Sequence, residues 1–338
     1  MQYATFESCL RCRRKKRGKC MRSFTIGKND AGQRLDRFLA KAIPLLPASL
    51  SQKYVRIKRI KVNGARAQRD QRLNTGDLVE CYVNDEFFDS PDENNVYLTI
   101  TTPKLTVVYE DENLLLLDKP AGMLCHAGDG PGGATLVDHL LAYLYQKREW
   151  RPREENAFTP ALCNRIDRNT SGLVIAAKNA EALRILNDKI RGREIAKFYL
   201  CVCLGRPDPP RGELKCFLRK DERENKMRVY HHAVPDGRSA VTRYDTLLTR
   251  EGLSLLEVEL LTGRTHQIRA SFADFGHPLL GDGKYGNGAV NRKYGETAQL
   301  LCAYRLRFDF PTDAGILEYL RGREFAAETP AFQRKYFG

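Results

Sequence analysis

Apolar residues recur at helical spacing in the first part of the chain. The apolar positions of one predicted helix are Leu35, Phe38, Leu39, Ala42 and Ile43. They lie three or four residues apart with charged residues between them, which is the pattern of a helix with one buried face. A second helix is predicted from about residue 49, with Leu50, Tyr54 and Ile57 on its buried side.

Short strand signals follow these two helices. Ile60 and Val62 lead into Asn63-Gly64, a dipeptide that favours tight hairpin turns, and a further strand is predicted at residues 78–83. We therefore expect residues 23–84 to form a small α/β domain. Its helices also carry a basic face, whose members are Arg37, Lys53, Arg56 and Lys58. Such a face is most often simply solvated, although it also suits a polyanionic partner.

The rest of the chain predicts a larger domain behind a linker. Residues 85–101 contain five acidic residues and no lysine or arginine, which is a linker composition. Beyond them, apolar runs at 105–109, 114–117, 173–177, 199–204 and 255–261 predict strands. Helices are predicted after Asn179 and Thr265, both capable of capping. For residues 102–338 this pattern favours an α+β fold, with a mixed, mainly antiparallel central sheet and flanking helices, over a doubly wound parallel sheet.

Charge narrows the class of partner. The 338 residues include 56 lysines and arginines against 42 acidic residues, a net charge of +14. Eight of the basic residues and one glutamate lie in the first 22 positions, so we expect residues 1–22 to be a disordered basic tail. Translation from Met21 would instead leave most of this tail outside the functional protein. The excess of positive charge favours RNA, DNA or an anionic membrane surface as the partner.

Cysteine usage and hydropathy indicate an intracellular protein. Ten cysteines are scattered along the chain, mostly within apolar stretches, which is typical of reduced cysteine rather than of a disulfide framework. Cys9, Cys12 and Cys20 have no nearby histidine and fall one ligand short of the usual zinc site, so we expect no metal. No apolar run is long enough to span a bilayer and no secretory leader opens the chain. We expect the protein to be cytoplasmic.

Two segments carry the candidate chemistry. Asp167 lies in a polar turn just before a buried strand, and Arg264 lies where a strand gives way to a helix. An aspartate in such a turn commonly accepts only backbone hydrogen bonds. An arginine at such a junction can equally pair with a structural carboxylate or bind a phosphate. Tyr199, in an apolar strand, would ordinarily be a core residue.

The motifs together resemble those of the RluA-type pseudouridine synthases. Residues 164–173, Asn-Arg-Ile-Asp-Arg-Asn-Thr-Ser-Gly-Leu, are similar to that family's His-Arg-Leu-Asp-x-x-Thr-Ser-Gly-Leu signature. The other matching motifs, in chain order, are residues 118–122, 197–199, 261–269, 276–282 and 285–286. The likeness covers about residues 100–312. Residues 34–39, 60–64 and 76–79 resemble the small RNA-binding module named after ribosomal protein S-four.

The resemblance implies roles for particular residues. Asp167 would be the catalytic aspartate, and Arg264 would pair with it. Tyr199 would pack against the target base, while Arg165 would hold the surrounding RNA. The basic face of the small domain would grip structured RNA, as the family's S-four-like module does. Asn164 stands where the family usually has histidine, so substrate choice stays open at that position.

The implied reaction isomerises uridine to pseudouridine, mostly in large-subunit ribosomal RNA or transfer RNA. It moves the uracil from a nitrogen–sugar to a carbon–sugar bond without a redox step or an external group, so we expect no cofactor. A stacked uridine must first be flipped out, at a cost of about a few kcal/mol. We expect the enzyme to be a monomer. The alternatives are a non-catalytic RNA-binding or ribosome-assembly factor with the same fold, and a DNA-directed basic protein, for which no DNA-binding motif is present.

Overall fold

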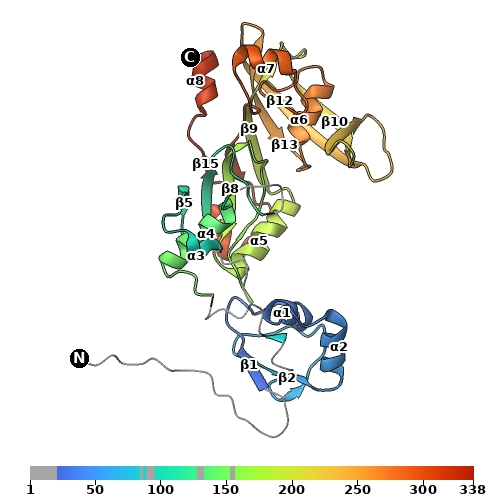
Figure 1. Ribbon diagram of the computed structural model, residues 1–338, viewed down its shortest axis with the longest axis vertical. Coiled ribbons are helices and arrows are strands. Elements are labelled where there is room, and N and C mark those ends of the chain that lie inside the picture. Colours follow the sequence, from blue (N-terminus) through green and yellow to red (C-terminus); the bar gives the residue numbers. More distant parts are fainter. Residues whose placement is uncertain (1–20, 84–86, 89–95, 128–132, 153–156) are drawn as a thin grey trace, which may run out of the picture. The chain divides into compact units, whose positions relative to one another are not determined.

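The computed structural model describes residues 21–83, 87–88, 96–127, 133–152 and 157–338 (Figure 1). The chain divides into two compact units, one formed by residues 1–95 with 148–159 and the other by residues 96–147 with 160–338. The expected tail overlaps the first strand, which begins at Met21, and the expected linker overlaps a short helix at Val96–Thr99. Cys9, Cys12, Cys20 and the acidic residues of the linker lie outside the described residues.

The described residues of the first unit form a four-stranded antiparallel sheet and two helices. Its elements are β1 (Met21–Thr25), α1 (Leu35–Ala42), α2 (Ala48–Arg56), β2 (Ile60–Val62), β3 (Ala65–Arg66) and β4 (Leu78–Tyr82). The strand order is β1-β4-β2-β3. Asn63 and Gly64 both have positive φ, as a two-residue hairpin turn between twisted strands requires. The predicted turn at these two residues is therefore confirmed.

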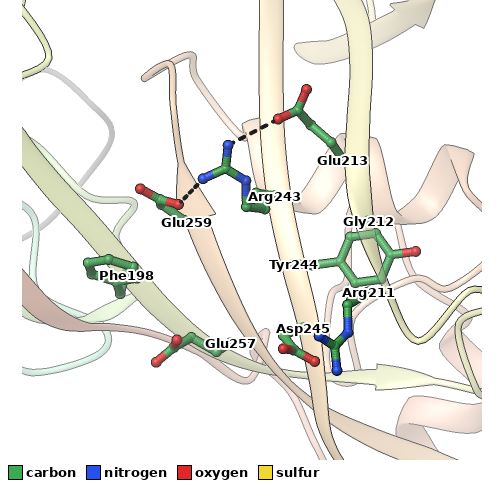
Figure 2. Close-up of a pocket in the computed structure, with 9 residues that line it drawn as sticks. All are labelled: Phe198, Arg211, Gly212, Glu213, Arg243, Tyr244, Asp245, Glu257 and Glu259. Carbon is green, nitrogen blue, oxygen red and sulfur yellow. Dashed lines mark hydrogen bonds and ion pairs between the residues drawn. The ribbon is translucent and has the colours of Figure 1, made fainter.

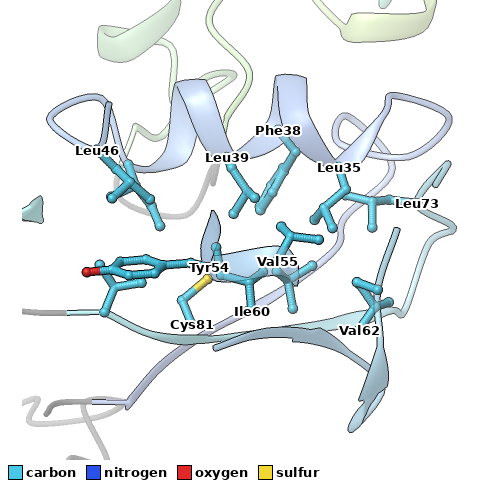
Figure 3. Packing of buried hydrophobic residues seen from close by; sticks show 14 of the residues in the cluster. Leu35, Phe38, Leu39, Leu46, Tyr54, Val55, Ile60, Val62, Leu73 and Cys81 are labelled. Atoms are coloured by element: carbon cyan, nitrogen blue, oxygen red, sulfur yellow. The ribbon is translucent and has the colours of Figure 1, made fainter. Parts of the chain in front are cut away.

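One apolar cluster fills the space between the helices and the sheet of this unit (Figure 3). Leu35, Phe38 and Leu39 of α1 are buried, as their spacing predicts. The prediction for Ile57 is wrong, because α2 ends at Arg56 and Ile57 lies just beyond it with 46% of its surface exposed. Val55 is buried in its place. The helix polarity therefore follows the predicted spacing except at the end of α2.

The second unit is built on an 11-stranded sheet. Its strands are β5 (Thr106–Glu110), β6 (Leu114–Lys119), β7 (Ala161–Leu162), β8 (Ser171–Ala177), β9 (Ile195–Leu204), β10 (Arg211–Asp221), β11 (Lys226–Tyr230), β12 (Arg238–Arg250), β13 (Leu253–Leu260), β14 (Leu301–Phe308) and β15 (Glu324–Ala326). Its helices are α3 (Val96–Thr99), α4 (Leu136–Gln146), α5 (Ala180–Arg191), α6 (Gln267–Asp274), α7 (Gly288–Tyr294), the 3₁₀ helix η2 (Gly315–Leu320) and α8 (Ala331–Phe337). In the described ranges, no helix is both long and apolar enough to cross a membrane.

The predicted fold class is confirmed. The main path of the sheet runs β11-β10-β12-β13-β9-β14-β8-β6-β5, and all its neighbours are antiparallel except β14 and β8. Helix α5 packs on β8, and α6 contacts β10, β11 and β12. Asn179 caps α5 as predicted, because its side chain accepts a hydrogen bond from the Ala182 amide. Thr265 does not cap α6; the residue before the helix is His266, in the left-handed region with φ 52°.

A glycine allows the parallel pair of β14 and β8 to form. Gly172 has φ 108°, and a Cβ atom there would lie 2.2 Å from the backbone oxygen of Ala303 on β14. Any larger residue would push the two strands apart. Ala303 is also the register partner of Tyr199 on β9. The close approach at Gly172 thus brings the start of β8, and the loop with Asp167 before it, beside the centre of the sheet.

Candidate active site

Asp167 lies in the loop between β7 and β8, and it pairs with Arg269 rather than with Arg264. Arg269 Nη1 donates a hydrogen bond to Asp167 Oδ2 at 2.8 Å. Arg264 Nε instead donates to the backbone oxygen of Ser239 at 3.1 Å. The prediction for Arg264 is wrong because this residue precedes α6, whereas the buried first turn of that helix carries Arg269 toward the loop.

Arg269 is held between two aspartates. Its Nε and Nη2 donate to the two carboxylate oxygens of Asp282 at 2.8 and 3.0 Å, a bidentate arrangement that fixes the plane of the guanidinium. A cation in the first turn of a helix is opposed by the helix dipole. Burial also disfavours the charged guanidinium, but the hydrogen bonds and charges of Asp282 and Asp167 outweigh it and raise the pKa of Arg269. The arginine is therefore a fixed positive charge against Asp167.

Asp282 is itself fully buried and held by several donors. The Lys284 and Tyr285 amides donate to its Oδ1 at 2.8 and 3.0 Å, in addition to the two bonds from Arg269. Burial alone would raise the pKa of this carboxyl, but the hydrogen bonds and charge of Arg269 hold it below its usual value. Asp282 thus fixes both Arg269 and the turn at Lys284 and Tyr285 that follows Asp282 itself.

A buried lysine anchors the loop that carries Asp167. Lys119, the last residue of β6, has no exposed surface, and its Nζ donates to the backbone oxygens of Pro120, Met123 and Arg168 at 2.8–3.0 Å. Three acceptors match the three hydrogens of an ammonium group. Burial lowers the pKa of Lys119 to about 8, against the opposing charges of Cys125, Asp167 and Asp118. Lys119 therefore ties the residue after Asp167 to the turn at the end of β6.

Asn164 supports the same loop from its other side. Its Oδ1 accepts a hydrogen bond from the Ile175 amide of β8 at 2.8 Å, so the amide side chain holds the chain before Asp167 against the strand after it. This contact gives the departure from the family's histidine a local structural role. Within the described residues, the hydrogen-bond partner of the Asp167 carboxylate is Arg269 and not the backbone of its own turn. The loop therefore does not form the Asx turn in which the Asp167 carboxylate accepts only backbone hydrogen bonds.

Tyr199 and Arg165 lie at opposite extremes of exposure. Tyr199 on β9 is 7% exposed, and burial, followed by the nearby charge of Asp167, raises the pKa of its hydroxyl. Tyr199 is the register partner of Ala303 on β14, the residue that Gly172 at the start of β8 approaches closely. Arg165 is exposed, two residues before Asp167. Both positions are compatible with the roles that the resemblance implies.

A histidine and a tyrosine complete the surroundings of Asp167. His266 Nδ1 lies 2.9 Å from the Tyr285 hydroxyl, and His266 Nε2 lies 3.8 Å from Asp167 Oδ2. No role was predicted for His266, Arg269, Asp282 or Tyr285, although all four lie within the matching motifs. The available signal was Arg269 itself, a lone charged residue in an otherwise uncharged helix start, with a downstream aspartate in a glycine-rich turn.

A separate groove, lined by residues of β9, β10, β12 and β13, contains none of the residues that surround Asp167 (Figure 2). It has a volume of about 450 Å³ and is lined by Phe198, Arg211, Gly212, Glu213, Arg243, Tyr244, Asp245, Glu257 and Glu259. Phe198 precedes Tyr199 on β9, and consecutive strand residues point to opposite faces. Arg243 is already paired with Glu213 and Glu259. This groove is therefore distinct from the Asp167 cluster.

The basic face of the first unit is solvent-accessible. Arg37, Lys53, Arg56 and Lys58 are all exposed. Arg56 also lines an open groove of about 510 Å³ with Arg66 and Arg69, whose remaining walls are Gln52, Val55, Ala67 and Gln68. Within the described residues, neither Arg56 nor Arg66 has a carboxylate partner. Arg56 and Arg66 thus offer positive charge that no described carboxylate neutralises, whereas Arg69 lies 3.6 Å from Asp36.

Known proteins share this sequence and fold. Residues 113–274 match the sequence model of a family described as RNA pseudouridylate synthase. An uncharacterized RNA pseudouridine synthase of Mycoplasma genitalium is 30% identical over 290 residues, which cover 84% of this chain and 88% of that protein. Ribosomal large subunit pseudouridine synthase C of Haemophilus ducreyi is 30% identical over 299 residues, 86% of this chain and 88% of its own.

A solved structure supports the fold independently. Human RNA Pseudouridylate Synthase Domain Containing 1 aligns with a TM-score of 0.54 at 22% identity, over 69% of this chain and 86% of that chain. At this identity the structural likeness shows only a shared fold. The relatives that are 30% identical along most of both chains show membership of the family. This chain accordingly belongs to the RluA-type family of RNA pseudouridine synthases, which are isomerases.

Proposed function

We propose that this enzyme isomerises specific uridines of large-subunit ribosomal RNA, with Asp167 as the catalytic aspartate. The observation that carries the proposal is the contact of 2.8 Å between Asp167 and the doubly anchored Arg269. The reaction needs an ionised carboxylate at the sugar, and a guanidinium keeps its charge at any working pH. The side chain of Asp167 is 27% exposed, so the paired carboxylate is still accessible to a substrate.

In this reaction the carboxylate of Asp167 acts on the ribose of the target uridine. The bond between uracil N1 and the sugar breaks, the uracil turns within the site, and C5 joins the same sugar carbon, after which the C5 proton is lost and N1 gains one. Asp167 either attacks the anomeric carbon or removes a sugar proton. Both routes use the ionised form that Arg269 stabilises.

The target uridine must leave its stack to reach Asp167. Flipping costs about a few kcal/mol, which aromatic contact in the pocket and phosphate contacts outside it offset. We propose that the ring of Tyr199, whose hydroxyl pKa is raised by burial and by the charge of Asp167, packs against the flipped base. Arg165 and the exposed basic face of the first unit would hold the surrounding RNA.

The names of the relatives support the choice of RNA. Ribosomal large subunit pseudouridine synthase C proteins from Haemophilus ducreyi and Vibrio parahaemolyticus align along 88% of their own length. Mapping pseudouridines in total RNA from cells with and without this gene tests the proposal. Loss of a site in large-subunit ribosomal RNA supports it, whereas loss confined to transfer RNA would reassign the substrate. Cytoplasmic localisation and a monomeric state stay predictions.

A substitution at Asp167 tests the catalytic role. We expect Asp167→Asn to abolish tritium release from RNA labelled at uridine C5 while RNA affinity stays within a few-fold, because the charge serves chemistry rather than docking. Asp245→Asn, which removes an exposed carboxylate in the separate groove, is the matched control and should keep normal turnover. Normal turnover in Asp167→Asn would contradict the assignment and favour a non-catalytic RNA-binding role.

A further inference from the structure

His266 approaches the Asp167 carboxylate beside Arg269. Its Nε2 lies 3.8 Å from Asp167 Oδ2, the same oxygen that accepts the hydrogen bond from Arg269 at 2.8 Å. Both side chains therefore approach the same oxygen, Oδ2. Within the described part of the chain this leaves Asp167 Oδ1 without a protein hydrogen bond, and thus available to the substrate.

The backbone holds His266 in an unusual conformation to achieve this. Its φ of 52° lies in the left-handed region, which residues other than glycine seldom adopt. Strain of this kind tends to be kept where it positions a functional side chain. The ring packs edge-on against Tyr285 with centroids 5.6 Å apart, and 16% of the side chain is exposed. The imidazole is therefore fixed in place beside Asp167.

The donors around the ring assign the proton on the imidazole. The Tyr285 hydroxyl accepts a hydrogen bond from the Met227 amide at 2.7 Å and lies 2.9 Å from His266 Nδ1. Because the hydroxyl already accepts one hydrogen bond, its own hydrogen is free to be donated to Nδ1. A neutral imidazole that accepts at Nδ1 carries its proton on Nε2. In that tautomer the N–H of His266 points toward Asp167.

Burial is the main reason why this imidazole favours its neutral form. Burial lowers the pKa of His266, and although Asp167 and Asp282 oppose that effect, Arg269 and Lys284 reinforce it. Protonation would also add a hydrogen at Nδ1, where it would face the hydroxyl hydrogen of Tyr285. A neutral imidazole is therefore favoured near neutral pH.

We propose that His266 is a positioning residue for the reaction: its Nε2–H orients the Asp167 carboxylate once substrate is bound, and the Tyr285 hydroxyl fixes the tautomer that makes this possible. The inference rests on the proposed catalytic role of Asp167. At 3.8 Å the contact is about 1 Å longer than a hydrogen bond. Contacts of this kind are often long without substrate and shorten in the substrate complex.

Two amide substitutions that differ only in reach test the proposal. In His266→Gln the side-chain N–H can occupy the Nε2 position, whereas in His266→Asn it reaches only the Nδ1 position. We expect His266→Asn to lower kcat roughly tenfold with KM within about twofold, and to move the acid side of the pH–rate profile to higher pH. His266→Gln should recover most of the rate and the original profile. Tyr285→Phe should lower kcat in the wild type but add little in His266→Asn.

The outcomes separate positioning from mere packing. Wild-type kcat and pH profile in His266→Asn would overturn the proposal, as would equal impairment of the Asn and Gln variants, which indicates a packing role. Asp167→Asn assayed on the same RNA separates the two ideas. If Asp167→Asn is inactive while His266→Asn is normal, the inference about His266 fails alone. If Asp167→Asn is active, both the proposed catalytic role of Asp167 and the inference about His266 fail.

Discussion

Positive charge is used in opposite ways in the two units of this protein. In the second unit, Arg269 and Lys119 are buried, and they are hydrogen-bonded to carboxylates and to backbone carbonyls respectively. In the first unit, Arg56 and Arg66 line an open groove and have no carboxylate partner among the described residues. A buried, paired cation has a fixed position, and salt screens its ion pair only weakly. An exposed cation attracts an anionic partner, and salt weakens that attraction. The two units should therefore fail differently when their cations are altered.

The largest effect is expected at Arg269. Arg269→Lys keeps the charge but cannot contact Asp167 and both oxygens of Asp282 at once, so we expect kcat/KM to fall by about 100-fold or more. Arg264→Lys is the matched control. Because the Arg264 side chain donates to a backbone oxygen rather than to a carboxylate, this variant should stay within about threefold of wild type. Tritium release on one RNA substrate measures both, and a larger loss in Arg264→Lys would restore the pairing implied by the resemblance.

The contrast between these two arginines shows where sequence reasoning is sufficient. The α+β class, the capped helix α5, the Asn63-Gly64 turn and the position of Asp167 before a buried strand all depend on short-range patterns. Each of these patterns involves residues only a few positions apart in the sequence. They therefore predict which segments contribute residues to the site.

The partner of Asp167 depended on information that is not local. Arg264 and Arg269 lie in one short segment, and which of them points inward depends on where α6 begins, three residues after Arg264. Asp282, which holds Arg269, is far enough along the chain that no periodicity connects the two. Asn164 similarly bonds to a strand 11 residues later. These contacts are set by tertiary packing, so the roles of individual residues could not be read from spacing.

A second effect is expected at Asp282. Asp282→Asn leaves Arg269 buried with one carboxylate instead of two, so we expect a loss of about 3 kcal/mol in the free energy of unfolding and roughly tenfold in kcat. The folded-state pKa of Asp282 is lowered, so its stabilisation is complete above the pKa of about 4 in the unfolded chain and is lost as pH falls below it.

Urea titrations across acidic pH check both parts of this prediction. The variant should lose less stability than wild type between about pH 5 and pH 3, because the linked carboxyl is gone. Asp309→Asn, at a half-exposed ion pair with Arg307, is the control and should change stability by less than about 0.5 kcal/mol. Parallel pH profiles for wild type and Asp282→Asn would mean that the buried pair does not contribute in this way.

Lys119 should affect stability more than chemistry. Lys119→Met leaves three buried carbonyl oxygens without their donor, at a cost of about 2–3 kcal/mol in the free energy of unfolding. Since the pKa of Lys119 is about 8 in the folded chain and higher when unfolded, wild-type stability should rise with pH from about 8 to 10.5 through this group. The variant should lack that rise. Lys220→Met, at an exposed pair with Glu222, should change neither quantity.

The smallest effect on chemistry is expected in the open groove of the first unit. Arg56→Gln with Arg66→Gln should weaken RNA binding by roughly three- to tenfold near 0.1 M salt, and lower the slope of log K against log salt by about 0.7–0.9 for each phosphate that is no longer neutralised. At saturating RNA, kcat should stay unchanged, because these cations position the substrate without touching the reacting sugar. Arg191→Gln, at an exposed pair with Asp188, controls for the removal of positive charge as such. A fall in kcat with unchanged affinity would contradict the division between docking cations and fixed cations, because it would make an exposed, unpaired arginine part of the catalytic geometry.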